Sequence, residues 1–233
     1  MKQINRIALA CLGLAFLAAT ANAAPKREKL VENIVAGEYV LEEIMADPAT
    51  AIPSDILKDA QGIIFTLNYR GGFMVGGHAG HGILIAKNPI SGEWGVPAFV
   101  RTGGATIGLQ LGVKEFDAVY VIMDLDTVRK AYTGRIDFGA DAAAVAGPLE
   151  SSREARQNID YKNAKILVYS NKKGLFAGVA VKAGWVSPNN KGTQAFYNTD
   201  YNMPEIVMSD WFELPPEANA LLQRLNYYTR GGR

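Results

Sequence analysis

Glycine is concentrated in one part of the chain, and this clustering constrains the fold more than any other feature. Twelve of the 24 glycines lie between positions 71 and 112, within a region of short apolar runs whose period is close to two. Glycine weakens flat strands but permits sharp bending and close approach of neighbouring backbones. Over residues 61–201 we therefore expect a strongly curved antiparallel sheet or a partial barrel. A phosphate-binding glycine loop is disfavoured, because no G-x-x-x-x-G-K-[ST] occurs and residues 103–108 lead into another apolar strand.

The remaining patterns predict a β-rich α+β domain with an N-terminal helix and a C-terminal helix. Apolar residues recur at helical spacing over residues 27–47, from Leu30 to Ile44, and the following Asp47-Pro48 is typical of a helix end. Further helices are expected at 53–60, at 125–132 with Asp124 or Asp126 as the cap, and at 216–228. The expected strands are 62–67, 72–78, 82–87, 96–101, 105–113, 118–123, 136–142, 164–170, 175–183 and 195–197.

The first 23 residues have the pattern of a signal peptide. Lys2 and Arg6 precede an apolar run over residues 7–19, and Ala21-Asn22-Ala23 is typical of a signal-peptidase site. The run is shorter than the ~20 apolar residues that a transmembrane helix needs. We therefore expect cleavage near Ala23, a single domain over residues 24–233, and a secreted or periplasmic location.

Composition excludes several classes of function. The chain has 24 Lys and Arg against 23 Asp and Glu, a formal charge of +1, whereas nucleic-acid binding usually comes with a strong basic excess. The single cysteine, Cys11, lies in the expected signal peptide. A mature chain without it would have no disulfide, no cysteine nucleophile and no thiolate metal site.

Several glycine-rich motifs, taken in their order along residues 31–201, resemble the SYLF domain. The resemblance rests on Gly72-Phe73-Met74-Val75-Gly76-Gly77, on Trp94 with Pro97-Ala98-Phe99, on Gly103-Gly104 leading into Gly108-Leu109-Gln110-Leu111-Gly112, on Gly139-Ala140-Asp141-Ala142, on Ala146-Gly147-Pro148, and on Tyr169-Ser170 followed by Lys173-Gly174-Leu175-Phe176-Ala177-Gly178.

The SYLF resemblance implies a non-enzymatic lipid-binding domain. Eukaryotic members of that family bind phosphoinositides, yeast relatives bind actin filaments, and bacterial members are secreted or attached to the cell envelope. Eukaryotic members contact membranes through a basic amphipathic N-terminal segment, whereas the helix expected here is acidic apart from Lys26, Arg27 and Lys29. For an exported chain, the resemblance implies an anionic phospholipid or another envelope component as the partner.

The sequence gives little support for a catalytic or metal-binding site. His78 and His81 have an odd spacing that places them on opposite faces of a strand, so no metal site is expected. The acid pairs Asp124 with Asp126 and Asp137 with Asp141 are better explained by capping and structural hydrogen bonds than by acid–base catalysis. No G-x-S-x-G motif occurs. We expect no enzyme activity, no metal and no cofactor.

Basic residues form the expected lipid-binding site. A faint repeat spaced by 103 residues places a cation-bearing turn after residues 63–65 and again after residues 166–168. The expected site consists of these turn cations and two cations of neighbouring strands: Arg70, Lys172, Lys173, Lys87 and Arg101. Each cation near an anionic membrane contributes ~1 kcal/mol, so attachment by charge is weak and sensitive to salt.

Two tryptophans are additional candidates for membrane contact. Trp94 and Trp185 both lie near expected turns, where interfacial anchoring is one interpretation. Burial in the core is the other, and it is favoured for Trp94. The sequence predicts a protein that binds anionic phospholipid without catalysis. The alternative is an envelope module that binds a protein partner and no lipid.

Overall fold

A single curved sheet organises the protein, as the sequence predicts. The computed structural model describes residues 25–48, 50–73, 75–89, 91–107, 113–138, 144–146, 164–170 and 184–232. Eight strands form the sheet in the order β5-β8-β3-β2-β1-β4-β7-β6, and every pairing is antiparallel except that of β6 with β7. The strands are β1 (Gly62–Phe73), β2 (Val75–Ala86), β3 (Ala98–Ile107), β4 (Val113–Ile122), β5 (Ile136–Asp137), β6 (Ala144–Ala146), β7 (Ile166–Ser170) and β8 (Gly184–Pro188).

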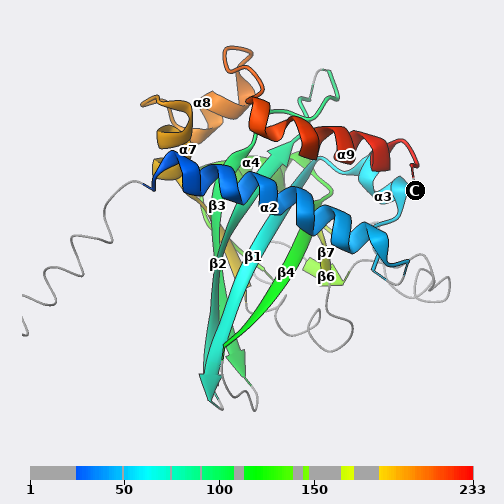
Figure 1. Ribbon diagram of the computed structural model, residues 1–233, viewed down its shortest axis with the longest axis vertical. Helices are drawn as coiled ribbons and strands as arrows, with labels where there is room; N and C mark the ends of the chain where they lie inside the picture. The colour runs from blue at the N-terminus through cyan, green and yellow to red at the C-terminus, as the bar shows by residue number, and fades with distance from the viewer. Residues whose placement is uncertain are drawn as a thin grey trace, which may run out of the picture.

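Helices surround one end of the sheet. They are α2 (Arg27–Ala46), α3 (Ser54–Asp59), α4 (Leu125–Thr133), α7 (Asn190–Tyr197), α8 (Met203–Met208), the 3₁₀ helix η1 (Pro216–Ala218) and α9 (Asn219–Thr229). Figure 1 shows α2 and α9 side by side across the upper part of the sheet, while β1 to β4 continue below the helical layer. The α+β class, the curved sheet and both terminal helices are therefore confirmed.

The central strands are longer than predicted. β1 and β2 have 12 residues each, which corresponds to ~40 Å of extended chain. The expected turn at residues 68–71 is wrong, because these residues lie inside β1 and pair with both β2 and β4. The break expected between residues 101 and 105 is likewise absent, because both fall within β3. Asn and Gly are typical of turns in a sequence, but here they lie within strands that pair with their neighbours.

The first face of the sheet is covered by α2, α3, α7 and α9. Residues of α2 at helical spacing, among them Ile34, Leu41 and Ile44, are fully buried against Phe65 and Ile83 of the sheet. Gly37 makes this approach possible, because a Cβ there would lie 2.9 Å from Ile83 Cδ1. Burying each such large side chain contributes about 1.5–3 kcal/mol.

The opposite face is covered by α4 and α8. Val128, Ala131 and Tyr132 of α4 pack with Ile64 and Tyr120 of the sheet. The α4 helix begins as predicted, because the Asp124 carboxylate accepts a hydrogen bond from the Thr127 N–H at 2.9 Å. The strand expected at 195–197 is wrong, because these residues end α7, whose first turn is capped by Asn189. The β propensity of these residues favoured a strand, but the cap at Asn189 stabilises a helix instead.

A buried polar ladder joins the central strands where the helices end. The Thr102 hydroxyl donates to Asn68 Oδ1 at 2.7 Å, and Asn68 Nδ2 donates to Thr66 Oγ1 at 2.8 Å. Thr66 in turn donates to the Ala118 carbonyl at 3.1 Å. Gly80 leaves room for this network, because a Cβ there would lie 2.5 Å from Asn68 Oδ1. The glycine clustering thus serves close approach between strands, as the sequence predicts.

Gly82 provides a test of this close approach. A Cβ at Gly82 would lie 1.9 Å from the Phe65 carbonyl oxygen, so Gly82→Ala must displace backbone in the core. We expect it to lower the free energy of unfolding by about 1–3 kcal/mol or more, measured by urea denaturation. Gly134→Ala is the control, because a Cβ at Gly134 meets nothing within 4 Å. Equal stability of the two variants would contradict this interpretation of the glycines.

Candidate functional site

Two hollows share a wall at the helical end of the sheet. The wall is formed by Trp94, in the connection between β2 and β3, and by Leu214, which precedes η1. Trp94 is only 8% exposed, which confirms the favoured interpretation that it is a core residue. Its backbone pairs with Lys87 in an isolated bridge, so the connection folds back on the end of β2.

Local hydrogen bonds hold the connection in place. Asn88 N–H donates to the Glu93 carbonyl at 2.8 Å, and Gly95 N–H donates to the Ala86 carbonyl at 2.8 Å. The Asn88 side chain accepts from Ser91 N–H at 3.2 Å. Gly92 has a φ of 72°, a conformation that favours glycine at this position. The connection therefore presents Glu93 and Trp94 in defined positions.

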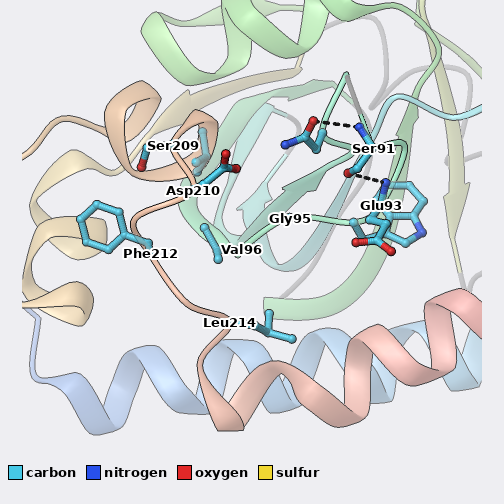
Figure 2. A pocket seen from close by; sticks show the side chains of 11 residues that line it. Ser91, Glu93, Gly95, Val96, Ser209, Asp210, Phe212 and Leu214 are labelled. Atoms are coloured by element: carbon cyan, nitrogen blue, oxygen red, sulfur yellow. Dashed lines mark hydrogen bonds between the residues drawn. The ribbon is translucent and has the colours of Figure 1, made fainter.

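The first hollow, called the acidic hollow, has a volume of about 470 Å³ and is lined by Glu93, Trp94, Val207, Ser209, Asp210 and Phe212, among others. Figure 2 shows Asp210 and Phe212 on one side and Ser91 and Glu93 on the other. Neither the Glu93 nor the Asp210 carboxylate forms an ion pair within the described part of the chain. Carboxylates beside aromatic faces suit a cationic group.

The second hollow, called the basic hollow, has a volume of about 560 Å³ and is also bordered by Trp94. It is lined by Lys58, Lys87, Trp94, Leu214, Asn226 and Arg230, and Glu93 also borders it. Both volumes fall within the ~300–1,000 Å³ typical of ligand pockets. Three cations and several amides around one hollow suit an anionic group such as a phosphate.

The Lys87 ammonium group is held in place by a hydrogen bond and by an aromatic ring. It donates to the Lys58 carbonyl at 2.6 Å and lies 4.8 Å from the centre of the Trp94 ring. Burial lowers the pKa of Lys87 below its ordinary value, and the nearby Asp59 carboxylate partly opposes this shift. Because the Lys58 carbonyl belongs to the last turn of α3, Lys87 also stabilises the end of that helix.

The other predicted lipid-binding residues do not gather around Lys87. Arg70 lies within β1 and pairs with His78, and nine residues of strand, up to ~30 Å, separate His78 from Lys87. Arg101 is exposed on β3, where its guanidinium donates to Asn189 Oδ1 at 3.1 Å. Lys172 and Lys173 lie outside the described residues.

The histidines and acidic residues considered as metal or catalytic candidates make packing and ion-pair contacts within the fold. His78 packs edge-on against Phe116 inside the sheet, whereas His81 stacks with Tyr69, so the two histidines face opposite sides of β2 as predicted. Among the described residues, no three His, Cys, Asp or Glu side chains are grouped as a metal site would require. Asp137 pairs with Arg135, and Asp141 lies outside the described residues.

An exposed aromatic cluster was missed by the sequence analysis. Trp211 is 75% exposed and lies 6.1 Å from Tyr201, measured between ring centres. Tyr201 in turn lies 6.1 Å from Phe212, which lines the acidic hollow. Trp185 is half-buried beneath the Arg135 guanidinium. The only available signal was a tryptophan in the acidic, proline-containing segment over residues 209–216, which lacks any regular period.

No helix among the described residues is long and apolar enough to cross a membrane.

Comparison with known proteins identifies relatives over most of the chain. Residues 103–228 match the Ysc84 family, described as a Las17-binding protein actin regulator. LAS seventeen-binding protein 3 of Saccharomyces cerevisiae is 31% identical over 190 residues, which cover 78% of this chain and 41% of the yeast protein. SH3 domain-containing YSC84-like protein 1 of Mus musculus is 26% identical over 184 residues, covering 78% of this chain and 53% of the mouse protein.

Protein YSC84 of Saccharomyces cerevisiae is 31% identical over 176 residues, covering 75% of this chain and 37% of the yeast protein. The chain therefore spans about half, or less, of the length of these curated relatives. The family match extends from β3 to α9 and includes more than half of the chain. As its glycine-rich motifs predict, the chain belongs to the Ysc84 family, the family of the SYLF domain.

Proposed function

We propose that this chain binds anionic phospholipid headgroups at a membrane surface and catalyses no reaction. The observation that carries the proposal is the basic hollow, in which Lys58, Lys87 and Arg230 surround one cavity beside Trp94. A phosphate entering this hollow would meet three cations and the side-chain amides of Asn219, Gln223 and Asn226. The description of the family as binding proteins supports binding rather than catalysis.

The proposed binding is weak and depends on charge. Three cations near an anionic surface contribute about 3 kcal/mol, at ~1 kcal/mol each. Salt at physiological ionic strength screens exposed charges over ~8 Å, so the attachment should weaken as salt is raised. We further propose that the chain acts in the cell envelope or outside the cell, after its first 23 residues have been removed, because these residues have the pattern of a signal peptide.

A second candidate function is docking of a protein partner. The observation that favours it is the exposed Trp211 ring, since large exposed aromatic groups are typical of interaction surfaces. The name of the yeast relative, LAS seventeen-binding protein 3, also describes binding to a protein.

The basic hollow can be tested with Lys58→Ser and Arg230→Ser combined. We expect co-sedimentation with anionic phosphatidylglycerol vesicles to weaken by about 30-fold, because two contributions of ~1 kcal/mol each are lost. The melting temperature should change little, since Lys58 and Arg230 are exposed. Lys165→Ser combined with Lys191→Ser is the control, because both lysines are exposed and neither lines the hollow. Equal weakening by the control pair would show that net charge, not the hollow, attracts the vesicles.

The lowered pKa of Lys87 predicts a pH dependence. As the pH rises toward 10.5, Lys87 should lose its proton earlier than an ordinary lysine, so vesicle binding should decline in this window. In the same window the unfolded chain holds more protons than the folded chain, so the Lys87 contribution to stability increases with pH. Lys87→Arg keeps its charge and should retain binding at high pH. An identical decline in this variant would remove Lys87 from the site.

The remaining basic residues predicted from the sequence need a separate test. Replacing Arg70, Lys172 and Lys173 together by Ser should weaken sedimentation with anionic vesicles if these residues also contact lipid. The melting temperature of the variant is measured alongside, so that weaker sedimentation is distinguished from loss of folding. Unaltered sedimentation would confine the lipid contact to the basic hollow.

A further inference from the structure

The acidic hollow and the exposed aromatic cluster form one continuous surface on the C-terminal segment. Phe212 lines the hollow and also contacts the ring of Tyr201, which in turn lies against Trp211. Met208 and Leu214 add exposed apolar side chains from the same segment. The surface therefore combines a cavity that can hold one side chain with an adjoining aromatic face that can cover a longer segment of a partner.

The charge of this surface is negative. Glu93 and Asp210 line the cavity from opposite sides, as Figure 2 shows, and Glu213 follows Phe212 in the chain. The carboxylates of Glu93 and Asp210 are exposed and have no ion-pair partner among the described residues. An anionic membrane would be repelled by these groups, whereas a guanidinium or ammonium group would be attracted.

Besides the carboxylates, Ser209 and two aromatic rings border the cavity. The Ser209 hydroxyl oxygen is buried and has no hydrogen-bond partner in the part of the chain that the structure describes. Trp94 and Phe212 supply aromatic rings beside the same cavity, and such rings attract cations at their faces.

We propose that this surface docks a polypeptide segment that carries arginine or lysine. A basic side chain of the segment enters the acidic hollow between Glu93 and Asp210, and apolar residues next to it pack on Tyr201 and Trp211. The proposal rests on the second candidate function, protein docking, and specifies the charge of the partner. Phospholipid binding uses the basic hollow instead, which shares only Glu93, Trp94 and Leu214 with this surface.

The test measures fluorescence anisotropy of a labelled peptide of about ten residues in which arginine alternates with leucine and proline. A matched peptide with glutamate in place of arginine is the charge control. At near-physiological salt we expect the arginine peptide to bind the chain that starts at residue 24. The glutamate peptide should not bind, because the carboxylates of the hollow repel it.

Variants locate the peptide on the surface. Glu93→Gln combined with Asp210→Asn should weaken the affinity for the arginine peptide about tenfold, since two charge-assisted contacts are lost. Trp211→Ser should weaken it by a similar factor, and its melting temperature should stay near that of the parent chain because Trp211 is largely exposed. Glu28→Gln combined with Asp55→Asn changes the net charge equally, at exposed positions that line neither hollow, and should alter the affinity less than twofold.

Several outcomes would overturn the proposal. These are absence of arginine-peptide binding, equal binding of the glutamate peptide, or equal weakening by the two pairs of charge variants. Anionic vesicles are assayed in parallel with each variant. If Trp211→Ser weakens vesicle binding and no peptide binds, the aromatic cluster contacts the membrane and peptide docking is excluded. Vesicle binding that persists without peptide binding separates failure of this proposal from failure of the phospholipid proposal.

Discussion

Three consecutive buried residues in β1 determine the architecture. Ile63, Ile64 and Phe65 point alternately to the two faces of the sheet, and all three are fully buried. A strand that is apolar on both faces needs a covering layer on each side, so α2, α3, α7 and α9 lie on one face and α4 and α8 on the other. Farther along the same strand the helices end, and the hydrogen bonds of Asn68 replace apolar packing between the central strands. Both hollows lie at the end where the two helical layers meet the connections of the sheet.

Structural features that depend on residues close together in the sequence could be predicted from it. Features that depend on residues far apart in the sequence could not. The α2 helix followed from its apolar spacing, and α4 followed from the cap at Asp124. The turn expected at residues 68–71 failed because Asn68 bonds to Thr102, a partner 34 positions away that no local pattern indicates. Likewise, Lys87 was selected as a binding residue, but Lys58 and Arg230 reach the same hollow from separate segments and could not be grouped with it in advance. Trp211 belongs to an irregular segment, where exposure follows only from the final packing.

Two hollows of different charge share one indole ring. Lys87 lies over the Trp94 ring, and two further cations border the basic hollow. Asp210 borders only the acidic hollow, whereas Glu93 borders both. The hollows are formed by residues 87–97 and 207–230 together with Lys58 of α3, and the last helix packs beside α2 against the sheet. Both proposed contacts therefore depend on the same packed element, and their chemical difference arises from a few side chains around a common wall.

The packing of α2 against α9 also affects the stage of synthesis at which the core can fold. Arg27 forms an ion pair with Glu217 at 2.7 Å, Arg224 forms one with Glu42 at 2.7 Å, and Leu221 and Leu225 are fully buried in the same core as Leu30 and Ile34 of α2. A ribosome makes α2 long before it makes α9. The first helix and the sheet face beneath it must therefore wait for nearly the whole chain before their apolar surface is closed. During synthesis this surface remains open, so the native core forms only once the final helix is available.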